Sequence, residues 1–457
     1  YGTIEFDNDF LGKESLKYLG FKSFDDNKKI KTLIVGDSHS KDIFNCFYQN
    51  IELFPNYQFR RLGHDNNTRL YISAFHPKEK KEEKNSMIKL LTSNPNFIKA
   101  EVIVISAQFS DNKKLESLPG FLNYLKKYNR VEDISIDYDD LMRYVGSVDV
   151  LDTQDNHTLW QRVYYSDSET NELNENLKKI YNILLSDGSN TNTSDLNVDA
   201  VDYCTFGNSN PFRIKIRNIL NDNFTYFYIK KIDSSRIYGL ELEHITSPYN
   251  LNFILNKNTL IEEHISGIPG DDFFSKKLIH CNEIEKSQIA KEFVKFSERC
   301  MVRLLGDMRA YNYVIVPTHD FDQVVYKIRA IDFDQQCYEG DFIFYRPQLF
   351  KDNYPVTSLI KDKLLQDSIN QYKIEERAII VKRILGAQER IENLLNSMKN
   401  DVISNDENVK QLSQQIYHLT KHNKFKYCSN MGEIMDSTID YLINNYENHE
   451  MLRTNVI

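Results

Sequence analysis

The sequence has few cysteines, and none of them has a partner at short spacing. Its six cysteines are scattered along the chain, with no Cys-x-x-Cys pair and no histidines at zinc-finger spacing. A disulfide framework or a structural zinc site needs a regular arrangement of such ligands. We therefore expect reduced thiols, which are typical of a cytoplasmic protein.

Long apolar runs and an excess of basic charge are also missing. The longest runs, such as "VIVIS" and "YVIV", fall far short of the roughly 18–20 residues that cross a bilayer. The net charge of −9 gives no general attraction to nucleic acid or to an anionic membrane. We expect neither nucleic-acid binding nor membrane insertion. Because the chain begins with Tyr1 rather than Met, it stays open whether a targeting segment precedes it.

The length of 457 residues predicts two or three domains. In the first part, short apolar runs alternate with amphipathic stretches. Strands are predicted at 31–36, 101–106 and 148–152, and helices at 40–51, 115–128 and 169–187. Such alternation indicates an α/β domain with a parallel sheet and flanking helices over residues 1–187.

A polar stretch, "SDGSNTNTSDLN" (186–197), then separates two different patterns. We predict a linker at 188–198 and an α+β domain over 199–457. Strands are predicted at 212–220, 223–232, 251–265 and around 313–331, with a helix at 234–245 and mainly helices from about 285. This order indicates a small sheet-rich lobe followed by a larger helical lobe.

The stretch "RLLGDMRAYNYVIV" (303–316) places Asp307 and Asn312 on a loop between two apolar runs. A predicted hairpin follows, and it ends in "IDFDQQ", which contains Asp332. The order of these features resembles the catalytic core of the protein-kinase-like superfamily, in particular its aminoglycoside and choline phosphotransferase branch. The resemblance spans roughly residues 200–457 and implies a bilobal kinase-like fold that uses ATP and Mg²⁺.

The resemblance also implies a role for each residue of this loop. Phosphoryl transfer depends mainly on positioning and charge neutralisation. Asp307 would orient the acceptor hydroxyl and take its proton, and Arg309 would neutralise the transferred group. Asn312 and Asp332 would supply the oxygen ligands that magnesium prefers.

The small lobe should hold a lysine paired with a helix glutamate. "YFYIKKID" resembles the Val-Ala-Ile-Lys strand, with Lys230 in the lysine position. Glu241 in the following helix is its predicted partner, with Glu243 as the rival. "TLIEEHISGIPGDDFF" resembles the segment between the lobes, whose backbone binds adenine, and this role would fall to Glu263, His264 and Ile265.

Some features depart from the family pattern. Leu305 stands where these families usually have His, and Gly207 alone takes the place of a glycine-rich loop. A simpler interpretation of the Asp307 loop is a turn capped by local hydrogen bonds. For Lys230 and Glu241, a solvated surface pair is the alternative.

The N-terminal stretch "KTLIVGDSHSKDIF" resembles the opening block of the SGNH (GDSL) hydrolases. Ser38 would be the nucleophile at a helix N-terminus, where backbone N–H groups stabilise an oxyanion. The family supplies the base as Asp-x-x-His, but Thr170 follows Asp167 at that spacing, and His157 is the nearest substitute. A serine without a base is a poor nucleophile, so we expect the fold without confident hydrolysis, and Ser38 as a helix N-cap is the alternative.

Three functions therefore stay open. The leading hypothesis is an ATP- and magnesium-dependent phosphotransferase acting on a hydroxyl of an unknown acceptor, fused to a degenerate SGNH-like domain. The second is an ester or carbohydrate O-acyl hydrolase that uses Ser38, with a regulatory pseudokinase domain. The third is a non-catalytic scaffold that binds ligands.

Overall fold

A computed structural model describes most of the chain. It covers residues 28–36, 52, 55–62, 98–106, 119–152, 155, 157–185, 193–205, 209–320, 323–448 and 451. The predicted helix at 40–51, Ser38 and Gly207 lie outside these residues. Contacts along the chain define two discontinuous units. One comprises 1–111, 144–167 and 200–213, and the other 112–143, 168–199 and 214–457.

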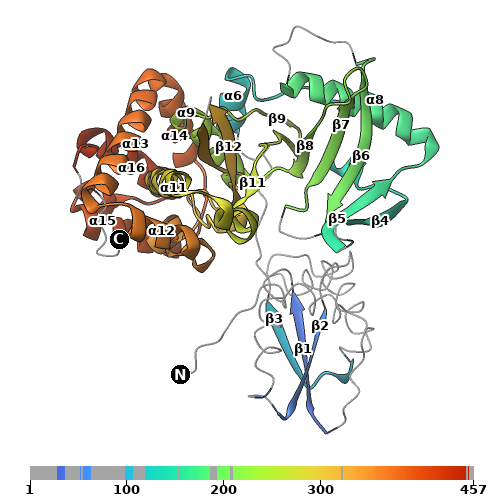
Figure 1. The fold of residues 1–457 in the computed structure, drawn as a ribbon, viewed down its shortest axis with the longest axis horizontal. Helices are drawn as coiled ribbons and strands as arrows, with labels where there is room; N and C mark the ends of the chain where they lie inside the picture. Colours follow the sequence, from blue (N-terminus) through green and yellow to red (C-terminus); the bar gives the residue numbers. More distant parts are fainter. Residues whose placement is uncertain are drawn as a thin grey trace. The chain divides into compact units, whose positions relative to one another are not determined.

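The first unit contains a parallel sheet of three strands in the order β2-β1-β3 (Figure 1). These strands are β1 (Ile30–Gly36), β2 (Tyr57–Leu62) and β3 (Val102–Ser106). The predictions of strands at 31–36 and 101–106 and of their parallel pairing are confirmed. β2 was not predicted, because three of the six residues in its "YQFRRL" sequence are polar.

The predicted third strand of this parallel sheet, at 148–152, forms a different structure. β4 (Gly146–Leu151) pairs antiparallel with β5 (His157–Tyr164), so this part of the prediction was wrong. Val148 and Leu151 of β4 are about half exposed. A stretch of five residues such as "VDVLD" does not by itself distinguish a strand of a parallel sheet from a strand of an exposed antiparallel hairpin.

The largest sheet has the strand order β4-β5-β6-β7-β8-β10-β9. Its pairs β4–β5, β5–β6, β8–β10 and β9–β10 are antiparallel. Its remaining strands are β6 (Leu196–Cys204), β7 (Phe212–Asn218), β8 (Phe224–Lys231), β9 (Phe253–Asn256) and β10 (Thr259–Glu263). A third sheet contains β11 (Ile268–Pro269), β12 (Tyr313–Asp320) and β13 (Gln323–Ala330). The strands predicted at 212–220, 223–232, 251–265 and 313–331 are thus confirmed, whereas β6 was missed.

Helices make up most of the chain after residue 283, as predicted. The α-helices of the described residues are α6 (Pro119–Lys127), α7 (Tyr138–Leu141), α8 (Asp167–Leu185), α9 (Ser234–Thr246), α10 (Gly270–Asp272), α11 (Glu283–Arg303), α12 (Tyr354–Lys363), α13 (Gln366–Gly386), α14 (Gln388–Lys399), α15 (Asp406–Thr420) and α16 (Met431–Asn445). α6, α8 and α9 confirm the helices predicted at 115–128, 169–187 and 234–245.

α11 is the central helix of the C-terminal part of the chain. It contacts α12, α13, α16 and β13, and Figure 1 shows the orange helices around it. Asn282 and Glu285 form a capping box at its start, which satisfies the free N–H groups of the first turn. Phe293, Phe296 and Cys300 are buried on its inner faces. The helix ends directly before the loop that carries Asp307.

The predicted N-terminal domain, 1–187, contributes residues to both units. α6 packs against α14, and α14 also contacts α9, so these three helices share one unit. Tyr124 on α6 and Arg130 just after it donate hydrogen bonds to the buried Glu241 carboxylate on α9. These two bonds to one buried carboxylate connect α6 and the residues just after it to α9, although more than 100 positions separate them in sequence.

Candidate functional site

The loop after α11 is held in place by backbone hydrogen bonds. Leu304 ends the helix in the left-handed conformation, with φ of 54°. Asp307 also has φ of 54°, a conformation in which Asp is tolerated better than most residues. The N–H of Gly306 donates to the Gln335 carbonyl at 3.1 Å, and that of Asp307 donates to the Phe344 carbonyl at 3.0 Å. These bonds place the Asp307 loop beside the segment that follows Asp332.

The side chains of this loop converge on Asp307. Arg309 Nε donates to Asp307 Oδ1 at 2.9 Å, and Asn312 Nδ2 donates to the Asp307 carbonyl oxygen at 2.7 Å. Burial raises the pKa of the Asp307 carboxyl, and the Arg309 guanidinium opposes this shift. The structure thus brings together the three residues that the sequence analysis singled out. The capped turn is also present, because the Asn312 amide bonds the loop backbone.

Asp332 lies two residues beyond β13 and close to the same loop. The N–H of Ile331 donates to the Asn312 carbonyl oxygen at 3.0 Å, which connects the end of the hairpin to the loop. Asp332 Oδ1 accepts a hydrogen bond from the Arg236 guanidinium at 3.0 Å, and Asp334 also forms an ion pair with Arg236. Burial and the charge of Asp332 raise the pKa of Asp334, against the effect of Arg236.

Lys230 has a different partner from the one predicted. Its Nζ lies 2.6 Å from Glu262 Oε2, and both side chains are more than nine-tenths buried. The antiparallel register of β8 and β10 pairs Leu260 with Lys230 and Tyr228 with Glu262. Lys230 and Glu262 are therefore diagonal neighbours, and diagonal neighbours on one face of a sheet are within reach of long side chains.

Glu241, the predicted partner of Lys230, lies in another cluster. Arg130 Nε is 2.6 Å and Arg390 Nη2 is 2.7 Å from its carboxylate, and Tyr124 donates a hydrogen bond to it. The rival, Glu243, pairs with Arg303 instead. Neither glutamate contacts Lys230, so the prediction of a Lys230–Glu241 pair was wrong.

Helix geometry explains this outcome. α9 begins at Ser234, only a few residues after Lys230, and its first turn presents Arg236 to Asp332 and Glu262. Glu241 follows Arg236 by five residues, so the two side chains leave the helix about 140° apart. The helix therefore supplies a cation to the site and directs its glutamate elsewhere.

Arg236, Glu262 and Asp334 were missed as site residues by the sequence analysis. Arg236 is the single arginine of α9, and nothing in the local sequence distinguishes it from an arginine on a helix surface. Glu262 lies in a predicted strand, but its place near Lys230 depends on the register of β8 with β10, which the sequence does not fix. Asp334 belongs to the quoted "IDFDQQ" motif, but nothing local shows that its carboxylate faces the same cation as Asp332.

The segment predicted to bind adenine follows β10. The Tyr228 hydroxyl and His264 Nδ1 are 3.1 Å apart, and the Tyr226 ring lies 5.5 Å from the His264 ring. Burial raises the pKa of Glu263, and Ile265 is buried. Of these residues, Glu263 is the last residue of β10, the strand that carries Glu262, and His264 and Ile265 directly follow it.

The SGNH-type residues are only partly described. Ser38 lies outside the described residues, so its relation to any base is not tested. Asp167 starts α8 and Thr170 lies in its first turn, whereas His157 is exposed on β5. The His157 imidazole lies 2.9 Å from the Asp149 carboxylate, so it already has an acidic partner.

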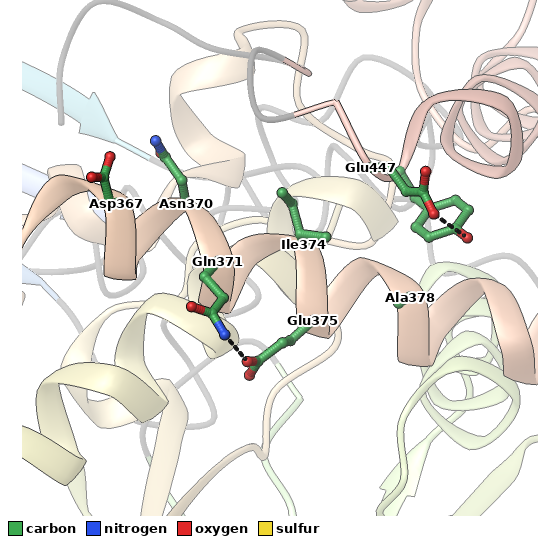
Figure 2. A pocket seen from close by; sticks show the side chains of 8 residues that line it. Asp367, Asn370, Gln371, Ile374, Glu375, Ala378 and Glu447 are labelled. Carbon is green, nitrogen blue, oxygen red and sulfur yellow. Dashed lines mark hydrogen bonds between the residues drawn. The ribbon is translucent and has the colours of Figure 1, made fainter.

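A pocket lies elsewhere, along α13. Figure 2 shows its labelled residues, and its charged residues are Asp367, Glu375 and Glu447. Gln371 donates a hydrogen bond to Glu375, which also pairs with Lys295 at 3.0 Å. None of the residues predicted for a functional site lines this pocket.

The comparisons with known proteins do not assign the chain to a family. A scan against models of protein families gives no match, and no curated protein matches the chain in a sequence search. Within the described residues, no group of three or more His, Cys, Asp or Glu side chains is placed to hold a metal ion. Among those residues there is likewise no helix with the length and apolar character that crossing a membrane requires.

Proposed function

We propose that the chain is an ATP- and magnesium-dependent phosphotransferase of the protein-kinase-like type, acting on a hydroxyl of an acceptor. The observation that carries this proposal is the convergence of Asp307, Asn312 and Asp332, which come from two segments joined by the hydrogen bond from Ile331 to Asn312. Lys230 lies in the same cluster of charges, through Glu262 and Arg236.

The donor atoms near Asp332 fit a hard cation. Asn312 uses its Nδ2 as a hydrogen-bond donor, which leaves the amide oxygen for a metal, and Asp332 and Asp334 supply carboxylate oxygens. Two carboxylates and an amide form a smaller protein set than a complete metal cage, and this suits magnesium, which keeps waters and phosphate oxygens in its shell. When bound, magnesium would neutralise charge on the phosphate groups.

The chain's own residues then divide the work. Asp307 orients the acceptor hydroxyl and takes its proton, and its raised pKa makes it a better proton acceptor than an ordinary aspartate. Lys230, held by Glu262, supplies positive charge for the nucleotide phosphates. Arg309 holds the Asp307 carboxylate through Nε, and its guanidinium stacks 5.3 Å from the Phe350 ring.

Nucleotide-dependent thermal shift with and without magnesium tests this proposal. We expect ATP to stabilise the wild type only when magnesium is present, and Asp332→Asn to remove this stabilisation while the protein stays folded. Calorimetry on the same two proteins measures the affinity directly. Unchanged magnesium-dependent ATP affinity in the Asp332→Asn protein would overturn the assignment.

We also propose an SGNH-like fold for the N-terminal part. The observation that favours it is the parallel sheet β2-β1-β3, in which β1 ends at Gly36 directly before the Asp-Ser sequence. A fluorophosphonate probe tests whether Ser38 is nucleophilic. We expect no Ser38-dependent labelling, because Thr170 stands in the place of the family's histidine. Labelling that Ser38→Ala abolishes would instead support the hydrolase.

A further inference from the structure

Arg236 is the most buried cation of the candidate site. Its side chain is 2% exposed, yet it reaches three carboxylates. Nη2 bonds Asp332 at 3.0 Å and pairs with Asp334, and Nη1 lies 3.5 Å from Glu262. Its buried Nε has no hydrogen-bond partner within the described part of the chain. The Arg236 guanidinium is therefore held by its attraction to the carboxylates more than by a full set of hydrogen bonds.

The backbone around Arg236 is fixed against the Asp332 segment. Ser235 Oγ donates to the Gln336 carbonyl at 2.6 Å. A Cβ added to Gly239 would lie 2.9 Å from Phe333 Cβ, so glycine is needed for this close approach of α9. The hydrogen bond and the close packing hold α9 against residues 333–336, so a change of partners at the site falls on the Arg236 side chain rather than on the helix backbone.

The charges of the cluster do not balance. Four carboxylates act on Arg236 or Lys230, those of Asp233, Glu262, Asp332 and Asp334, against these two cations. The carboxylates thus outnumber the two cations by two, and the side chains of Asp332 and Asp334 keep 35% and 22% of their surface exposed, where a cation can reach them. Buried charge is strongly disfavoured unless it is compensated, so the cluster favours the uptake of a divalent cation.

We propose that Arg236 is a built-in counter-ion of the Asp332–Asp334 pair, which a divalent cation must displace from at least one carboxylate in order to bind. The inference rests on the proposed function, because it takes Asp332 and Asp334 as metal ligands. Its consequence is that Arg236 weakens metal binding while it stabilises the metal-free protein. If Arg236 only positioned Asp332 and Asp334 for the metal, its substitution would instead weaken metal binding.

Titration with Mn²⁺ alone, followed by electron paramagnetic resonance, tests this inference on the full chain. We expect Arg236→Gln to bind Mn²⁺ about tenfold more tightly than the wild type, because removing a nearby positive charge favours the cation. We also expect the variant to melt at a lower temperature without metal and to regain most of this loss with Mn²⁺. If Arg236→Gln does not fold, Arg236→Lys, which keeps the charge but not the forked geometry, should show a smaller change in the same direction.

Arg299→Gln is the matched control for Arg236→Gln, and Arg299→Lys is the matched control for Arg236→Lys. Arg299 is equally buried and pairs with Glu376 at 2.9 Å, away from Asp332 and Asp334. The control substitutions at Arg299 should lower the melting temperature without changing Mn²⁺ affinity. Unchanged or weaker Mn²⁺ binding in the Arg236 variants would overturn the inference, and so would a lack of Mn²⁺ binding by every protein tested. ATP consumption with magnesium, measured separately, decides the proposed function in each case.

Discussion

The family resemblance predicts that Glu241 pairs with Lys230, whereas the structure places it in a buried cluster with Arg130 and Arg390. The substitution Glu241→Gln distinguishes these two roles. Glu241 is fully buried, and its carboxylate bonds Arg130 at 2.6 Å and Arg390 at 2.7 Å. Glutamine keeps the shape and one acceptor oxygen but removes the negative charge. Two guanidinium groups would then share a neutral partner in the interior.

The expected loss of stability follows from the burial of these groups. Removing one partner of a buried ion pair typically destabilises a protein by about 3–5 kcal/mol. Arg390 is 19% exposed, so water partly relieves its loss, and the Tyr124 hydroxyl can still bond to the glutamine oxygen. We therefore expect a decrease of about 3 kcal/mol in the free energy of unfolding, at the lower end of this range.

Urea denaturation followed by far-UV circular dichroism measures this effect, because the helices of the unit that contains Glu241 dominate the signal. With typical slopes, the midpoint should fall by about 1 M. Glu375→Gln is the control, since Glu375 is 40% exposed and its pair with Lys295 should contribute less than about 1 kcal/mol. Magnesium-dependent ATP affinity of the folded Glu241→Gln protein should equal that of the wild type. A variant of normal stability with weakened ATP binding would refute this reasoning and restore the Lys230–Glu241 pair.

Three further predictions concern the candidate site. Asp307→Ala should keep ATP–magnesium binding, measured by calorimetry, but lower turnover by about 10²–10⁴-fold. Asn312→Ala should weaken ATP–magnesium binding as well. If both variants stay active and only melt at a lower temperature, the capped turn is the better interpretation. Glu262→Gln should weaken ATP binding by about tenfold because its lysine loses a charged partner, and unchanged affinity would show that this pair is only structural. Gly239→Ala should lower the melting temperature, because its new Cβ would lie 2.9 Å from Phe333 Cβ; a variant as stable as the wild type would show that α9 can shift.

Local sequence patterns predicted much of the secondary structure. Apolar runs such as "KTLIVG" and "VVYKIRAI" predicted β1 and β13, because a strand is recognised from consecutive residues. The same patterns could not assign a strand to its sheet. The run at 148–152 forms half of an antiparallel hairpin, and its pairing depends on β5, whose mixed sequence "HTLWQRVY" was not recognised as a strand.

The loop with Asp307 and Asn312, the hairpin after it and Asp332 at its end are all visible in the sequence by itself. They lie within 26 residues of one another, and the local hairpin, which pairs Tyr313 with Ala330, brings its two ends together. The partner of Lys230 was decided only by the tertiary structure. Its predicted partner, Glu241, and its observed partner, Glu262, are both glutamates within 32 positions of it. An ion pair depends on which side chains share a buried face, and here the register of β8 with β10 and the rotation of α9 make that choice. Because each buried charge must find an opposite charge wherever the packing places one, the pairs Lys230–Glu262, Arg236–Asp332 and Glu241–Arg390 could be known only from the folded chain.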